Sequence, residues 1–401
     1  MLAPAIRRGF ATASSAGRPL VVLGLESSAD DTCASVVTSS RQILSNVVLK
    51  QSTIHQTYGG IHPLHAQEAH QRNMPLAVSR ALKEANVGLN DLDGIAFTRG
   101  PGMYGCLSVC AGAAKALAAS TGKPLMGVHH MQAHALTPLL TSHLSPSPHP
   151  PPSFPFLTLL LSGGHTLLLH ASSLSSFKIL ATTHDESIGA CLDKASRDLG
   201  VDWALGGGSP GAALEKFAFP SLSLSAADGD DDGEVKGKYA FPTPFKGELA
   251  FSYAGLRSSL TRLLSARPAA EMDKQEKQRL GRAFMLAAFR QIEEKVALAL
   301  RMRERAGEAR VKGLVVSGGV ASNLVLRDRL RMKLDDLGYR DMPLIFPPPK
   351  YCTDNAAMIA FVGLLRLERG LVDDPFTVMQ RSKWSVEECE AEFEGRAERR
   401  A

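Results

Sequence analysis

The feature that most constrains the fold is a short apolar segment ending in a polar or glycine-rich turn, which occurs in both halves of the chain. Residues 20–25 (LVVLGL) run into the acidic segment 26–32 (ESSADDT), and residues 156–161 (FLTLLL) run into Ser-Gly-Gly at 162–164. The pattern occurs again at residues 313–320 (GLVVSGGV). Such runs are typical of buried strands, and segments with helical patterns separate them. The sequence therefore predicts an α/β protein with two related lobes and a cleft between them.

Two histidines one helical turn apart form a candidate metal site. His130 and His134 lie in the segment VHHMQAH, and residues at i and i+4 share one face of a helix. Alone, such a pair is more typical of solvated or structural histidines. Asp354, far downstream in the segment YCTDN, offers a carboxylate as a third ligand. Two imidazoles and one carboxylate leave open positions on a catalytic ion, so these three residues are the predicted metal site.

The Ser-Gly-Gly turns at Ser162–Gly164 and at 317–319 are compatible with phosphate binding. Glycine lets backbone N–H groups approach an anion closely, and a helix N-terminus after the turn adds a favourable dipole. A helical pattern after the second turn places Asn323 near such an N-terminus. One turn of this kind is usually only a tight turn, but two in equivalent contexts favour a nucleotide cleft. Neither GxxxxGK[ST] nor a dinucleotide GxGxxG is present, which disfavours those pockets.

Spacing alone leaves the role of two further groups open. Asp193 lies in a segment with a helical pattern, where a ribose or metal contact and a surface salt bridge fit equally well. The glycine cluster at 206–211 fits either a nucleotide-contact loop or a plain flexible loop. The histidine pair also resembles a zinc protease, but HExxH needs a glutamate directly after its first histidine. Met131 stands there, so peptide hydrolysis is disfavoured.

Composition narrows the class of protein further. No apolar run reaches about 18 residues, so no membrane span is expected. The six cysteines are scattered without a CxxC pair, which fits a reducing compartment. Residues 1–18 contain three arginines and no acid, which is typical of a mitochondrial presequence. Without those arginines the formal net charge of +5 becomes 5 − 3 = +2, which neither demands nor excludes a nucleic-acid partner.

The expected domains follow from these segments and from two regions that read as loops. The predicted loops are the proline-rich segment 142–153 and the acidic segment 221–238. The expected division is a presequence at 1–18, an N-terminal lobe at 19–150, a C-terminal lobe at 151–375 and a tail at 376–401.

Eight sequence blocks resemble the tRNA N6-adenosine threonylcarbamoyltransferase family, in its mitochondrial branch. In family order they are LGLESSADDT, TRGPGMYGCLSVCAGAAKALA, GVHHMQAHAL, LLLSGGHT, CLDKAS, FPTPFKGELAFSYAGLRSSL, VSGGVASNLVLR and YCTDNAAMIA, covering about residues 20 to 370. The resemblance implies the α/β fold of actin, hexokinase and Hsp70 (the ASKHA fold), with two ribonuclease-H-like lobes around a nucleotide cleft. The chain departs from the family's usual ETSCD, since it has Glu26-Ser27-Ser28-Ala29-Asp30, so a cysteine there is not essential.

The resemblance also implies site residues. His130, His134 and Asp354 correspond to the ligands of one divalent metal ion per subunit, iron or zinc. The residues that correspond to the adenylate-binding strand and turn are Leu160, Leu161, Ser162, Gly163 and Gly164, and the remaining nucleotide contacts are Asp193, Gly211 and Asn323. Because the glycine region is an insertion relative to the family pattern, Gly208 is an alternative to Gly211.

The implied activity is transfer of threonylcarbamoyl from threonylcarbamoyl-AMP, made by a separate synthase, to N6 of adenosine 37 in mitochondrial tRNAs that read ANN codons. The metal would orient substrate oxygens and offset growing charge, and Asp31 is the candidate carboxylate near the reacting amine. The resemblance further implies tRNA as a partner, a homodimer and the mitochondrial matrix as location. Two other classes stay open, a small-molecule kinase or ATPase of the same fold and a non-catalytic, ATP-regulated scaffold.

Overall fold

The computed structural model describes residues 17–52, 54, 58, 60–144, 151–207, 209–220 and 239–394. The chain divides into two compact units, one of residues up to 133 together with those from 354 onward, the other of residues 134–353. The divisions after residues 133 and 353 differ from those at 150 and 375 expected from the sequence. The later one falls before 375 because the helix at 356–368 packs on the first unit's sheet. Residues 1–16 of the expected presequence and the acidic segment 221–238 lie outside the described residues.

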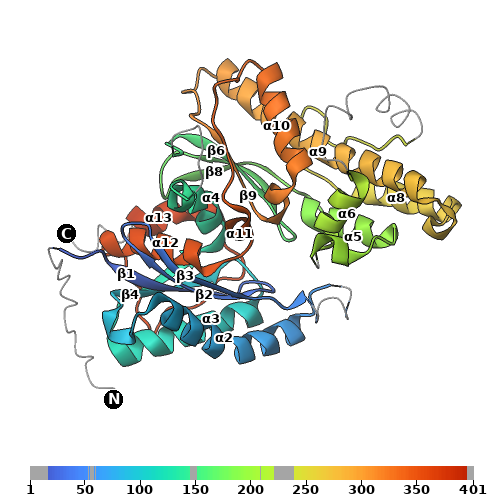
Figure 1. Cartoon of the computed structure of the whole chain (residues 1–401). Coiled ribbons are helices and arrows are strands. Elements are labelled where there is room, and N and C mark those ends of the chain that lie inside the picture. Colours follow the sequence, from blue (N-terminus) through green and yellow to red (C-terminus); the bar gives the residue numbers. More distant parts are fainter. Residues whose placement is uncertain are drawn as a thin grey trace. The chain divides into compact units, whose positions relative to one another are not determined.

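The first unit is built on a five-stranded sheet in the order β3-β2-β1-β4-β5 (Figure 1). β1, β2 and β3 pair antiparallel, whereas β4 and β5 continue the sheet parallel to β1. The strands are β1 (Val21–Glu26), β2 (Thr32–Thr38), β3 (Ile43–Leu49), β4 (Gly94–Gly100) and β5 (Leu125–His129). The helices are α2 (Pro63–Ala85), α3 (Tyr104–Thr121), α12 (Ala356–Glu368) and α13 (Cys389–Glu394), with short 3-10 turns at Leu89–Asp91 and Val386–Glu388. α4 (His130–Thr141) begins in this unit and continues into the second.

The alternation of side chains along β1 explains why helices cover both faces of this sheet (Figure 1). Leu23 and Leu25 belong to the core formed with α2 and α3. Gly24, between them, faces α12, where a Cβ at this glycine would lie 2.4 Å from the Ala356 carbonyl oxygen. Both faces of β1 are therefore buried, and α12 is held close to the sheet.

Replacing Gly24 with alanine is expected to lower the free energy of unfolding by about 3 kcal/mol, since overpacking against rigid backbone is costly. The added Cβ would also meet the Ala360 amide nitrogen at 2.6 Å, and neither backbone atom can move as a side chain could. Urea denaturation measures the change. Gly112→Ala is the matched control: Gly112 is exposed inside α3 with nothing within 4 Å of the position that an added methyl group would occupy, so about 0.5–1 kcal/mol of stabilisation is expected. Equal stability of the two variants would contradict the close approach of α12.

The C-terminal segment 371–394 belongs to the first unit and is bonded to it along its length. The Asp373 carboxylate accepts a hydrogen bond from the Gly127 N–H at 2.7 Å, and the Arg381 N–H donates to the Arg99 carbonyl at 2.7 Å. The ring of Trp384 stacks under the guanidinium of Arg99, 5.4 Å from its centroid. The segment 376–394, expected as a tail, is therefore packed against the ends of β4 and β5.

The second unit repeats the topology of the first. Its sheet has the order β10-β9-β6-β7-β8, with β6, β7 and β8 antiparallel and β9 and β10 parallel to β6. The strands are β6 (Phe156–Leu161), β7 (Thr166–Ala171), β8 (Phe177–Thr182), β9 (Leu314–Ser317) and β10 (Leu344–Ile345). The helices are α5 (Ile188–Asp198), α6 (Pro210–Ala218), α8 (Ala254–Ala266), α9 (Lys274–Arg305), α10 (Leu324–Asp336) and α11 (Pro349–Cys352), with 3-10 turns at Trp203–Gly206, Ala269–Glu271 and Gly319–Ser322. Two sheets of one topology match the two related lobes that the sequence predicts.

The second unit's core joins the sheet to its helices. Leu159 and Leu161 of β6 pack in one cluster with residues of α5, α6, α9 and α10. α9 begins where the Asp273 carboxylate accepts a hydrogen bond from the Glu276 N–H at 2.7 Å, and it continues as a single helix. Among the described residues, no helix combines the length and apolar character needed to cross a membrane. All six cysteines are buried and none forms a disulfide.

Candidate functional site

The predicted metal-binding histidines lie at the start of α4, which the preceding residue fixes in place. His129 ends β5, and its Nδ1 accepts hydrogen bonds from the N–H groups of Met131 and Gln132 at 3.2 and 3.3 Å. Its Nε2 donates to the Trp384 carbonyl oxygen at 3.1 Å. An imidazole therefore caps the helix N-terminus, where a serine, threonine or aspartate is usual. The cap and the C-terminal segment together set the position of His130.

His130, the first residue of α4, lies between two carboxylates. Its Nδ1 is 3.0 Å from Oε2 of Glu26, at the end of β1, and its Nε2 is 3.5 Å from Oδ1 of Asp354. Asp354 precedes Asn355, the N-cap residue of α12, whose side chain accepts a hydrogen bond from the Met358 N–H at 3.0 Å. The strand end, the α4 start and the α12 start thus converge on this imidazole.

His134 follows His130 by one turn of the same helix, so α4 itself sets the spacing of the two rings. One ligand atom from each of His130, His134 and Asp354 lies within 4.8 Å of the others, and both histidines are buried. Two imidazole nitrogens and one carboxylate oxygen suit zinc or ferrous iron, so the donor set fits the implied ion. The three residues predicted from the sequence are brought together.

The carboxylates around His130 dominate the electrostatics of this region. Burial acts to lower the pKa of His130, but Glu26 and Asp354 outweigh it and raise the pKa to about 9. Burial acts to raise the pKa of Glu26, and the charge of His130 outweighs it and holds that pKa below its usual value. For Asp31, the candidate catalytic carboxylate, burial and repulsion from Asp30 and Asp354 raise the pKa to about 8. A divalent cation would relieve this excess of negative charge.

In the second unit, the two Ser-Gly-Gly turns lie at the carboxyl ends of the adjacent parallel strands β6 and β9. The first, Ser162–Gly164, leads into the antiparallel strand β7, and the second, at 317–319, leads through a 3-10 turn toward α10. Their contexts are therefore not equivalent, contrary to the sequence-based expectation. They are nevertheless close, because Gly318 (φ 96°) approaches the carbonyl of Leu161 so tightly that a Cβ would lie 2.3 Å from its oxygen. Ligands of α/β sheets bind at such strand ends.

The N-terminus of α5 packs directly on the first turn. The Ser187 hydroxyl, which caps α5, donates to the Gly163 carbonyl at 2.6 Å, and the Gly189 N–H donates to the Ser162 carbonyl at 3.2 Å. Gly163 and Gly164 are exposed, and Leu160 and Leu161 are the buried strand residues that carry the turn. The helix dipole expected near this turn is thus supplied by α5, although a strand follows the turn in sequence.

Asp193 and Gly211, two further predicted nucleotide contacts, are hydrogen-bonded to each other. Asp193 is on α5, and its Oδ1 accepts from the Gly211 N–H at 2.8 Å in the first turn of α6. Burial raises the pKa of Asp193, and the Gly211 N–H opposes that shift. Gly208, the alternative to Gly211, lies outside the described residues. The structure thus brings the N-terminus of α6 to the side of α5.

Asn323, the last predicted contact, caps α10. Its Oδ1 accepts from the Leu326 N–H at 2.9 Å, and its Nδ2 faces the Met285 sulfur at 3.7 Å. The Glu215 carboxylate of α6 accepts from the Leu324 N–H at 2.7 Å. Hydrogen bonds therefore link the first Ser-Gly-Gly turn to α5, α5 to α6 and α6 to α10, so the predicted nucleotide residues form one connected group.

The sequence analysis missed three residues in these two regions: Glu26, Gly189 and Glu215. Glu26 carries a partial sequence signal: it ends an apolar strand, and a charged residue buried at such a place needs a partner, but the sequence does not say which one. The other two act through contacts with distant segments, for which one sequence holds no signal.

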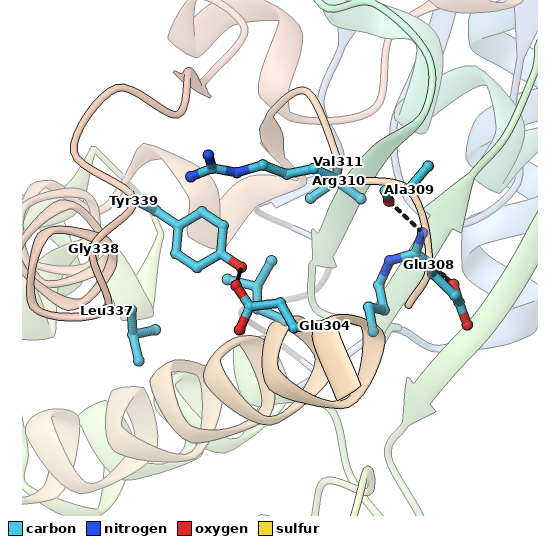
Figure 2. A pocket seen from close by; sticks show the side chains of 10 residues that line it. Glu304, Glu308, Ala309, Arg310, Val311, Leu337, Gly338 and Tyr339 are labelled. Atoms are coloured by element: carbon cyan, nitrogen blue, oxygen red, sulfur yellow. Dashed lines mark hydrogen bonds and ion pairs between the residues drawn. The ribbon is translucent and has the colours of Figure 1, made fainter. Parts of the chain in front are cut away.

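A cavity of about 260 Å³ lies elsewhere, between the end of α9 and the end of α10 (Figure 2). Its polar groups pair among themselves, as in the Tyr339–Glu304 hydrogen bond, and none of its residues belongs to the predicted site.

Two sheets of the same strand order, the second with Ser-Gly-Gly turns at the ends of β6 and β9, give the fold of the actin, hexokinase and Hsp70 class. The solved structure of HypF from T. kodakarensis superimposes with a TM-score of 0.50 at 15% identity, covering 87% of this chain and 49% of HypF. At that identity the likeness speaks only for the fold. The fold class predicted from the sequence is confirmed.

Sequence comparisons then give the family. The family model for tRNA N6-adenosine threonylcarbamoyltransferase matches residues 42–361. An enzyme of that name from Chelativorans sp. (strain BNC1) is 38% identical over 391 residues, covering 95% of this chain and 99% of its own. A probable mitochondrial one from Arabidopsis thaliana is 36% identical over 366 residues, covering 89% of this chain and 71% of its own. The chain belongs to the tRNA N6-adenosine threonylcarbamoyltransferase family and is a transferase.

Proposed function

We propose that this protein transfers the threonylcarbamoyl group of threonylcarbamoyl-AMP to N6 of adenosine 37 in mitochondrial tRNAs that read ANN codons. The product is N6-threonylcarbamoyladenosine. The observation that carries the proposal is the match to a threonylcarbamoyltransferase over 99% of that enzyme's length, which leaves no major part of the relative without a counterpart here. The His130, His134 and Asp354 group supports it, because a phosphotransferase of the same fold has no need of such a ligand set.

In this proposal the adenylate binds to the second unit. Its phosphate faces the exposed backbone of Gly163 and Gly164, where the N-terminus of α5 offers a favourable dipole. Asp193, Gly211 and Asn323 complete this proposed site, with Asp193 and Gly211 acting as a hydrogen-bonded pair. Leu160 and Leu161 contribute by holding the turn, since their side chains are buried.

The metal site is proposed to hold one iron or zinc ion per subunit on His130, His134 and Asp354. A bound ion acts there as a Lewis acid that offsets charge on oxygen atoms during acyl transfer. The chain's own residues hold and orient the reactants. The N6 nitrogen forms a bond to the carbamoyl carbon, the bond from that carbon to the phosphate oxygen breaks, and AMP leaves with the bonding electrons. The proton lost from N6 passes to the Asp31 carboxylate, a buried group that lies close to the charge of Asp354.

The partners and the location are part of the same proposal. A separate synthase supplies threonylcarbamoyl-AMP, tRNA is the acceptor, and the enzyme works as a homodimer in the mitochondrial matrix. The name of the Arabidopsis relative and the arginine-rich, acid-free start of the chain support a mitochondrial location. Arg18, the last residue of the expected presequence, pairs with Asp93 at 2.8 Å.

Purified protein with threonylcarbamoyl-AMP and unmodified mitochondrial tRNA is expected to form the modified nucleoside and AMP in equal amounts. Asp31→Asn, which cannot take a proton, is expected to lower kcat by about 10²–10³-fold while metal content stays unchanged. Nucleoside analysis of the digested tRNA measures the product. Phosphorylation of a small molecule without tRNA modification would identify a kinase instead, and ATP binding without turnover would identify a scaffold. An Asp31→Asn variant as fast as the native enzyme would remove Asp31 from the mechanism.

A further inference from the structure

Glu26 is a fully buried carboxylate, and both of its oxygens accept hydrogen bonds. It is the last residue of β1, and none of its surface is exposed. Its Oε1 accepts a hydrogen bond from the Ser28 N–H, and its Oε2 accepts one from the Thr98 hydroxyl of β4. A buried carboxylate is costly unless its partners are well placed, so two adjacent strands hold this group rigidly.

The same Oε2 atom lies 3.0 Å from Nδ1 of His130. A carboxylate is only an acceptor, so Nδ1 carries the proton and donates it to Glu26. In the neutral imidazole this leaves the lone pair on Nε2, the nitrogen that faces Asp354 at 3.5 Å. The contact therefore determines both the orientation of the ring and which nitrogen is free to bind a metal.

We propose that Glu26 is a positioning residue of the metal site: it orients His130 through Nδ1 and so makes Nε2 the metal-binding nitrogen. Glu26 does not act as a base or as a metal ligand itself, because both of its oxygens already accept hydrogen bonds from groups of the protein. Carboxylates that bond the second nitrogen of a ligating histidine also increase its basicity toward the metal. The inference rests on the proposed metal site, but not on the identity of the acyl group or of the acceptor.

Zinc affinity of the full-length, metal-stripped protein tests the role without tRNA or threonylcarbamoyl-AMP. Glu26→Gln keeps the shape of the side chain and removes its charge, so the dissociation constant for Zn²⁺, measured by competition with a chelating dye, is expected to rise about 10–100-fold. Glu68→Gln, an exposed acid of the same unit on α2, is the matched control and should bind zinc as the native protein does. A folded Glu26→Gln variant within twofold of the native affinity would overturn the proposal.

A second measurement on the native protein does not depend on how well any variant folds. Nitrogen-15 NMR of the zinc-loaded protein with labelled histidine is expected to show His130 protonated at Nδ1 and metal-bound at Nε2. Metal bound at Nδ1 would contradict the proposed role.

His134→Ala distinguishes failure of the Glu26 role from failure of the metal site itself. If His134→Ala weakens zinc binding and Glu26→Gln does not, only the role of Glu26 fails. If neither variant weakens zinc binding, the metal site fails as well.

Discussion

Replacing His134 with alanine is expected to remove the bound metal and to lower kcat/KM for threonylcarbamoyl transfer by about 10³-fold. The magnitude follows from the several kcal/mol that a Lewis-acid ion supplies and from the 1.36 kcal/mol that corresponds to each tenfold in rate. His134 is one of the three proposed metal ligands. Without it, only His130 on α4 and Asp354 before α12 remain, and two ligands hold a catalytic ion too weakly. Metal analysis by mass spectrometry and steady-state kinetics measure the two effects on the same sample.

The matched control is His143→Ala, which removes an exposed histidine just beyond the end of α4 and should change neither quantity. Because His134 is buried, the melting temperature of each metal-free variant must be compared first, so that unfolding is not mistaken for metal loss. Native activity in a folded, metal-free His134→Ala protein would rule out the metal-assisted reaction, although the family assignment would stand.

At the metal site, the local spacing of residues could be predicted from the sequence, whereas contacts between distant segments could not. The i, i+4 spacing of His130 and His134 is a local property of a helix, and α4 has that spacing. Asp354 is more than two hundred residues away, and its place beside His130 depends on the packing of α12 against β1 through Gly24. Glu26 could not be assigned a role from the sequence, because that role depends on β1, β4 and α4 meeting around one carboxylate.

The fold is predictable in its repeated strands but not in their order. The apolar runs at 20–25 and 156–161 are β1 and β6, each at the centre of its sheet. The run at 313–320 holds β9, which in topology corresponds to β4 and not to β1 or β6. Strand order depends on pairing between distant segments, so strand–turn patterns that look equal in sequence can occupy different places in a sheet. The same limit hides the contact of α5 with the Ser162 turn, since the two segments are not adjacent in sequence.

Gly189→Ala is expected to lower kcat/KM for threonylcarbamoyl-AMP by about 10²-fold, because a misplacement of about 1 Å in a binding group costs that much. A Cβ at Gly189 would lie 2.5 Å from the carbonyl oxygen of Ser162 and 2.7 Å from the amide nitrogen of Gly163. These are backbone atoms of the proposed phosphate-binding turn, so the turn or α5 must shift. Kinetics with varied threonylcarbamoyl-AMP, together with calorimetric binding of AMP, measure the effect.

Gly255→Ala provides the control, because Gly255 is the second residue of α8 as Gly189 is the second residue of α5, but nothing lies within 4 Å of an added Cβ. It should bind AMP with native affinity. Gly189→Ala should keep its full metal content, since its clash is with Ser162 and Gly163 and not with a metal ligand. Loss of AMP affinity with retained metal would therefore locate the adenylate at this turn. A methyl group cannot stay 2.5 Å from the Ser162 carbonyl oxygen, so the turn must move in the variant. Native AMP affinity in a folded Gly189→Ala protein would therefore mean that the nucleotide binds elsewhere.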